Sequence, residues 1–94
     1  MKINIQSLHF TPHAELNNFV LDKVTKLEKF DHNILSGDVC LKLEKSSTTD
    51  NKVCEIKLEI PGNDLFAKKQ SKTFEEATVL AVDALQHQIE KLKN

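Results

Sequence analysis

Lysines at short intervals are the residues of this chain whose type and spacing could do chemistry. Lys23, Lys26 and Lys29 recur at every third position of a predicted helix, and Lys23 falls inside the apolar stripe of that helix. Such an ammonium group either reaches water along its own stem or contacts a phosphate in a seam beside a second helix. The sequence contains no arginine, so each phosphate contact would be a point charge rather than a two-pronged fork. These residues alone leave both interpretations open.

A second set of candidate residues lies in the last third of the chain. It consists of the acid-free run Lys68, Lys69 and Lys72, followed by His87, Gln88 and Lys91. Lys91 would also suit the C-terminal end of a helix, where positive charge stabilises the helix dipole. The formal net charge is −1, whereas nucleic-acid-binding domains are more often strongly basic. An RNA-binding hypothesis therefore requires these lysines to gather in a single cleft.

No arrangement of residues in the sequence predicts catalysis. The four histidines fall in different predicted elements, and Thr11-Pro12 prevents His9 and His13 from sharing a helical face. No nucleophile lies in a recognisable strand–turn–helix elbow. The pair Glu75-Glu76 is explained by its place in the first turn of a helix. We therefore predict that the protein is not an enzyme and that it binds no metal, cofactor or small-molecule substrate.

Two amphipathic helices are predicted to carry most of these residues. The first runs from Pro12 to about Phe30, with Thr11 as its N-cap. The second runs over residues 73–93 and begins with a capping box formed by Thr73 and Glu76. Its apolar stripe is long enough to require a broad partner surface, such as a sheet. Small residues line one flank of that stripe, so we expect the first helix to pack there; this flank carries Ala77, Ala84 and Gln88.

Four strands are predicted from the alternation of apolar and polar residues. They cover residues 2–8, 38–45, 52–60 and 65–72. In the third, Val53 is predicted to face outward with the charged residues. In the fourth, Leu65 and Ala67 rather than Phe66 are predicted to face the core. The segment 61–64 predicts a type II turn in which Gly62 supplies the positive φ.

The predicted element order is β-α-β-β-β-α, an α+β fold forming a single domain over residues 1–94. Each strand has one apolar face, so both helices should cover the same side of the sheet and leave the other side charged and wet. Cys40 and Cys54 should lie on opposite faces, which argues against a disulfide. No apolar run approaches the ~20 residues of a membrane span, and the N-terminus lacks the apolar core of a signal peptide. We expect a cytoplasmic protein without a membrane partner.

Four segments, in their order and spacing, resemble the ribosome-hibernation family. These segments are MKINIQ at 1–6, KVTKLEKFD at 23–31, PGNDLFAK at 61–68 and DALQHQIEK at 83–91. The family comprises hibernation-promoting factors and ribosome-associated translation inhibitors, which are sigma-54 modulation protein-like, and this chain resembles the short form. The resemblance implies a double-stranded-RNA-binding-domain-like fold with a four-stranded sheet and two helices on one face.

The same resemblance implies a partner and a mechanism. The partner would be the small ribosomal subunit, both its rRNA and its proteins, bound in the channel of messenger and transfer RNA. The protein would inhibit translation in stationary phase or stress and would be monomeric off the ribosome. The family's lysines in the first helix fall on Lys23 and Lys26, and its polar face in the last helix falls on Gln88 and Lys91. The predicted RNA-binding residues are Lys23, Lys26, Lys29, Lys68, Lys69, Lys72, His87, Gln88 and Lys91.

The last helix departs from the family pattern. Positions that are often basic in relatives here hold Ala84, Gln86, His87, Glu90 and Leu92. Each phosphate contact that is lost lowers the salt dependence of binding by about 0.7 to 0.9 in slope. Two alternatives therefore stay open: a regulatory protein-interaction domain of the same fold with weak or no RNA binding, and a general binder of double-stranded RNA.

Overall fold

The computed structural model describes residues 1–44 and 50–93 and has the predicted element order. The strands are β1 (Lys2–Leu8), β2 (Ser36–Leu43), β3 (Lys52–Ile60) and β4 (Asn63–Ser71). The helices are α1 (Ala14–Thr25), the 3₁₀ helix η1 (Lys26–Lys29) that continues it, and α2 (Phe74–Lys93). The end of the second predicted strand, at Lys45, lies outside the described residues. The α+β prediction is confirmed.

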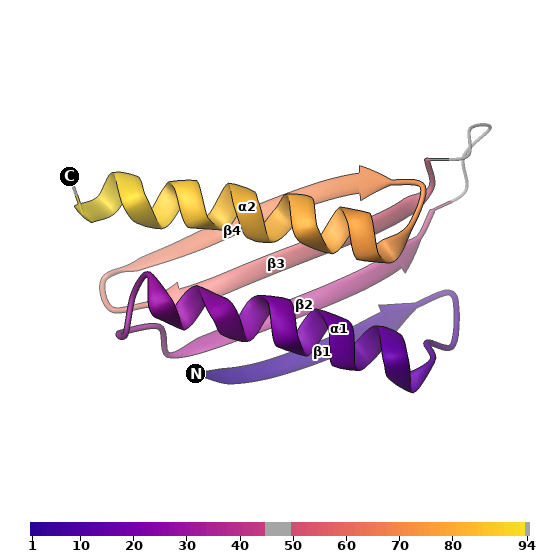
Figure 1. Ribbon diagram of the computed structural model, residues 1–94, viewed down its shortest axis with the longest axis horizontal. Coiled ribbons are helices and arrows are strands. Elements are labelled where there is room, and N and C mark those ends of the chain that lie inside the picture. Colours follow the sequence, from indigo (N-terminus) through magenta and orange to yellow (C-terminus); the bar gives the residue numbers. More distant parts are fainter. Residues whose placement is uncertain (45–49, 94) are drawn as a thin grey trace.

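The sheet has the strand order β1-β2-β3-β4, and both helices cover the same face of it (Figure 1). β1 pairs with β2 in parallel, because α1 carries the chain back across the sheet before β2 begins. β2–β3 and β3–β4 are antiparallel neighbours. α1 and α2 run side by side in the same direction, with α2 over the β4 side and α1 over the β1 side (Figure 1).

One apolar core fills the space between the helices and the sheet. Its fully buried members include Val24 and Leu27 from the α1–η1 segment, Leu41 and Ile56 from the central strands, and Leu85 from α2. Within the described part of the chain, no helix is long and apolar enough to cross a membrane.

The β3–β4 hairpin confirms the predicted register of the last strand. Leu65 is 7% exposed and faces the core, whereas Phe66 is 53% exposed on the open face of the sheet. Gly62 in the connecting turn has a φ of 79°, as predicted. The prediction for Val53 needs a correction, because this side chain lies on the open face yet is fully buried. Val53 does not belong to the core cluster between the sheet and the helices. Its burial therefore has a cause other than contact with the helices.

The prediction for the start of the first helix is wrong by two residues. The helix begins at Ala14 with His13 at the N-cap, whose carbonyl oxygen accepts hydrogen bonds from the N–H groups of Leu16 and Asn17. Thr11 does not cap this helix. Phe10 stacks on Phe74 with ring centroids 4.4 Å apart, and this tertiary contact fixes the segment before α1.

The start of α2 is as predicted, but its neighbour is not. The N–H of Glu76 donates to Oγ1 of Thr73 at 3.0 Å. The flank with Ala77, Ala84 and Gln88 packs against β4 rather than α1, and Gln88 Nε2 donates to the Phe66 carbonyl oxygen at 2.9 Å. Small residues on this flank bring α2 close to the outermost strand of the sheet.

Candidate nucleic-acid interface

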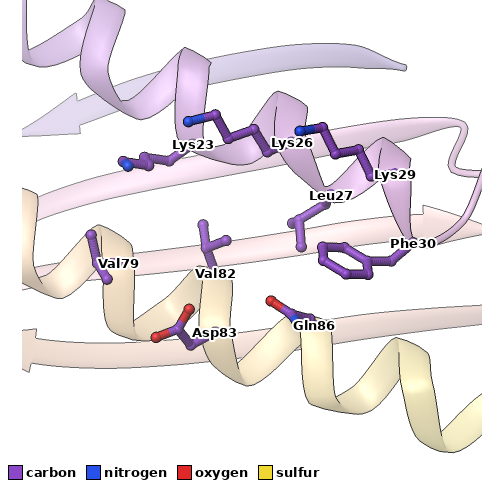
Figure 2. A pocket seen from close by; sticks show the side chains of 9 residues that line it. All are labelled: Lys23, Lys26, Leu27, Lys29, Phe30, Val79, Val82, Asp83 and Gln86. Carbon is purple, nitrogen blue, oxygen red and sulfur yellow. The ribbon is translucent and has the colours of Figure 1, made fainter.

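A groove runs between the α1–η1 segment and α2 and has a volume of about 260 Å³. Figure 2 shows its two rims: lysines on the α1–η1 side and a mixed set of side chains on the α2 side. Leu27 and Phe30 extend from η1 and its end toward α2. The lining residues are Lys23, Lys26, Leu27, Lys29, Phe30, Val79, Val82, Asp83 and Gln86.

The lysine rim consists of the three residues first singled out from the sequence. The Lys23 Nζ lies 5.4 Å from the centroid of the Phe19 ring, and its side chain is partly buried. Its ammonium group therefore lies over the Phe19 ring while the residue lines the groove, and a phosphate contact by Lys23 stays a prediction. Lys26 forms an exposed ion pair with Asp22, at 3.3 Å. Among the residues that the structure describes, Lys23 and Lys29 have no carboxylate within ion-pair distance.

The opposite rim comes from α2 and includes two polar residues that the sequence analysis did not select. Asp83 is exposed at this rim, and Gln86 donates from Nε2 to Oε1 of Glu90 at 3.1 Å. Val79 lies one turn earlier on the same flank. Val82 packs against the core, and helical spacing could have placed Val79, three residues before it, and Gln86, four residues after it, at its side. Asp83 follows Val79 by four residues and so lies on the same flank. The wrong assignment of the flank that faces α1 hid this signal.

The lysines of the 68–72 run do not join this groove. Lys68 points to the open face of the sheet, where it lies 3.8 Å from Glu55 and 3.9 Å from Glu44. Lys69 alternates with Lys68 and therefore faces the helix side of β4. Lys72 follows the end of β4 and is exposed.

The candidate residues of α2 lie outside the groove as well. Gln88 is held by the edge of β4, as described above. His87 and Lys91 are exposed and do not line the groove. The structure therefore brings Lys23, Lys26 and Lys29 together along one groove, whereas the other six candidate residues are distributed over separate surfaces. RNA binding by any of them stays a prediction.

The open face of the sheet carries compensated charge. Lys42 and Glu55 pair at 2.7 Å, and the hydrogen bond that the Lys42 ammonium donates to the Glu55 carboxylate raises the pKa of Lys42. Lys57 pairs with Asp64 at 3.6 Å. Both cysteines are free: Cys40 is partly exposed on this face, and Cys54 is buried on the helix side, as predicted. The described residues contain no cluster of three metal-ligating side chains.

Comparison with known proteins gives this geometry a context. Residues 3–94 match the family described as "Sigma 54 modulation protein / S30EA ribosomal protein". A ribosome hibernation promoting factor from Pseudomonas putida is 30% identical over 93 residues, which cover 99% of this chain and 87% of that protein.

Two solved structures share the fold. The N-terminal domain of Thermus thermophilus Protein Y superposes with a TM-score of 0.84 at 20% identity, covering 98% of this chain and 99% of that one. A ribosomal subunit interface protein from Coxiella burnetii superposes with a TM-score of 0.87 at 16% identity, covering 99% and 98%. Because the family match spans nearly every residue, the chain belongs to the Sigma 54 modulation protein / S30EA ribosomal protein family, which includes the ribosome hibernation promoting factors.

Proposed function

We propose that this protein binds the small ribosomal subunit in the channel that messenger and transfer RNA occupy, and thereby inhibits translation in stationary phase or stress. The family consists of non-enzymatic ribosome-associated factors. The observation that carries the proposal is the row of lysines along one rim of the groove, Lys23, Lys26 and Lys29. Binding to the ribosome also places the protein in the cytoplasm, where it acts as a monomer.

The distribution of ion pairs supports this rim as the RNA contact. On the open face, Lys42, Lys57 and Lys68 each have a carboxylate within 4 Å. On the groove rim only Lys26 has such a partner among the described residues, and that pair is exposed to solvent. Exposed pairs are weak, so a phosphate can replace Asp22 at little cost. Lysines elsewhere in the described residues also lack a carboxylate within ion-pair distance, namely Lys2, Lys52, Lys69, Lys72, Lys91 and Lys93. The rim differs from them because Lys23, Lys26 and Lys29 recur within one continuous segment beside a groove, although the whole chain carries a net charge of −1.

The mechanism is occupancy rather than chemistry. Lysine contacts with rRNA phosphates release counterions, and this release supplies affinity that falls as salt rises. Three such contacts correspond to a slope of about 2 to 3 in log affinity against log salt. A protein held in the channel excludes messenger and transfer RNA for as long as it stays bound, and it leaves the ribosome intact when it dissociates.

A sedimentation experiment tests the proposal. We expect the protein to co-sediment with small subunits in sucrose gradients, less so as salt increases, and we expect the triple variant Lys23→Gln, Lys26→Gln, Lys29→Gln to remain at the top of the gradient. The matched control changes the same charge on the open face, Lys2→Gln, Lys57→Gln, Lys68→Gln, and should sediment like the unmodified protein. Equal behaviour of the two triple variants would refute the groove as the contact surface.

A second candidate function is a regulatory protein-interaction domain that no longer binds RNA. It is favoured by the acidic residues at the groove, since Asp22 pairs with Lys26 and Asp83 lies on the opposite rim. It predicts no co-sedimentation with small subunits even at low salt. A general binder of double-stranded RNA would instead bind naked duplex RNA in the absence of ribosomes, and the same preparation can be assayed for this by gel shift.

A further inference from the structure

We propose that the groove between α1–η1 and α2 receives one unpaired nucleobase, whose hydrogen-bonding edge contacts Asp83 and Gln86 while the flanking phosphates lie on the lysine rim. This inference rests on the proposed function for the class of ligand, RNA, and goes beyond it by assigning the base a site. It also gives a role to Asp83 and Gln86, which line the groove but are not needed to bind phosphate.

The two rims of the groove differ in charge. All three lysines come from the α1–η1 side, whereas α2 contributes the carboxylate of Asp83 and the amide of Gln86 (Figure 2). A phosphate placed centrally in the groove would face Asp83 and be repelled by it. The arrangement therefore favours a ligand that is anionic on one side only and that presents hydrogen-bond donors on the other side. A nucleotide with its phosphates toward α1 and its base toward α2 meets both conditions.

The floor of the groove suits the flat face of a base. Its accessible part consists of the Phe30 ring and Val82, with Val79 at one end, and the fully buried Leu27 lies beneath them. In Figure 2 the Phe30 ring lies between η1 and α2. Unstacked RNA bases pack on aromatic and apolar side chains, whereas bases in a duplex stay stacked and present only their edges. A groove of about 260 Å³ accordingly selects a base from a single-stranded or looped segment.

The polar groups of the α2 rim restrict which base fits. An ionised carboxylate only accepts hydrogen bonds, so Asp83 requires donors on the base. Guanine offers adjacent N1–H and N2–H donors that match two carboxylate oxygens, while uracil offers only N3–H. The amide of Gln86 donates to Glu90, which leaves its carbonyl oxygen available to accept another donor. We therefore expect guanine to be preferred over uracil.

Short RNAs test this assignment in the absence of the ribosome. The probes are seven-nucleotide single strands, all uridine or with one central guanosine, titrated into the isotopically labelled protein and followed by NMR at the Val79, Val82 and Leu27 methyl groups. We expect shifts at these methyls and about tenfold tighter binding of the guanosine strand, the size of one good two-pronged base contact. Asp83→Asn should abolish that preference while the salt slope stays unchanged. The control Asp64→Asn, on the open face, should preserve the preference.

Other outcomes would overturn the inference. If the groove binds phosphates alone, Asp83→Asn will tighten the binding of both strands equally, because it only removes repulsion. The absence of methyl shifts at millimolar RNA would likewise exclude a base in the groove. Neither result touches the proposed function, which depends on small-subunit sedimentation and on the lysine triple variant. If the protein does not co-sediment with small subunits, the proposed function is refuted. The oligonucleotide titrations then still decide by themselves whether the groove binds a base.

Discussion

Threonine precedes both helices of this protein, and the two residues differ in what they contact. Oγ1 of Thr73 accepts a hydrogen bond from the Glu76 N–H, so Thr73 satisfies one of the free donors at the start of α2. Thr11 is exposed, and His13 occupies the N-cap position of α1 without a side-chain cap. A capping motif in the sequence therefore predicts a cap only where the backbone before the helix is free to adopt the N-cap conformation.

This difference gives a matched pair of variants. We expect Thr73→Ala to lower the free energy of unfolding by about 1 kcal/mol, because an N–H of the first turn of α2 loses its acceptor. Thr11→Ala should change it by less than about 0.5 kcal/mol, as for other exposed substitutions. Urea denaturation followed by circular dichroism measures both. A larger loss for Thr11→Ala would show that this residue contributes something other than a cap.

The two cysteines should differ in reactivity. Burial raises the pKa of the Cys54 thiol to about 11, and Cys54 also accepts a hydrogen bond from Thr78 Oγ1 at 3.7 Å. Cys40 is partly exposed, and its pKa is raised, mainly by burial and further by Glu55. Since the thiolate is the reactive form, we expect a chromogenic disulfide reagent at pH 8 to label Cys40 alone in the folded protein. In a Cys40→Ser variant, labelling should require denaturant; rapid labelling without it would contradict the burial of Cys54.

At the scale of elements, α2 has three different environments around its circumference. One side faces the sheet, one flank packs on β4 through Ala77, Ala84 and Gln88, and the other flank lines the groove. The core-facing side provides the helix with most of its stability, because a helix of this kind gains more from buried apolar surface than from intrinsic propensity. The groove flank is therefore available for binding without carrying the fold.

A pair of leucines on α2 tests this division. Leu85 is 0% exposed and Leu80 is 41% exposed. Leu85→Ala should lower the free energy of unfolding by about 2 to 5 kcal/mol, since it removes buried methyl groups and leaves a cavity. Leu80→Ala should stay within about 0.5 kcal/mol of the unmodified protein. Thermal unfolding curves measure both, and similar losses would mean that α2 is rotated about its axis relative to this structure.

At the scale of the whole molecule, charge is sorted by face rather than by total amount. On the open face of the sheet, Lys42, Lys57 and Lys68 pair with acids on neighbouring strands. The lysines of α1 and η1 gather at the groove, and one acid, Asp22, offsets them in part. Within a Debye length of about 8 to 10 Å, this local arrangement matters more to an approaching phosphate than the net charge of −1.

Removing that acid should strengthen RNA binding. We expect Asp22→Asn to raise affinity for small subunits about two- to fivefold at low salt, because it frees Lys26 and removes a negative charge from the rim. The gain should shrink as salt screens the charges. Asp64→Asn, which frees Lys57 on the open face, should have no effect. Filter binding at three salt concentrations measures the change, and a weaker Asp22→Asn complex would argue that the ion pair orients Lys26 for binding.

The sequence by itself determined the elements, their order and the face that each strand buries. Alternating and helical periodicities report burial directly, and so the register of β4, the turn at Gly62 and the cap at Thr73 were all predictable. The lysine rim was predictable for the same reason, since Lys23, Lys26 and Lys29 are neighbours within a single continuous segment.

Only the tertiary structure decided which surfaces meet. The placement of the two helices across the sheet decides which flank of α2 faces α1. Asp83 and Gln86 complete the groove because they lie on that flank. The same holds for Lys68, whose charge is taken up by acids on neighbouring strands. A periodic pattern identifies the apolar side of a helix, but it carries no information about what lies to the left or right of that side. Contacts between distant segments set those neighbours.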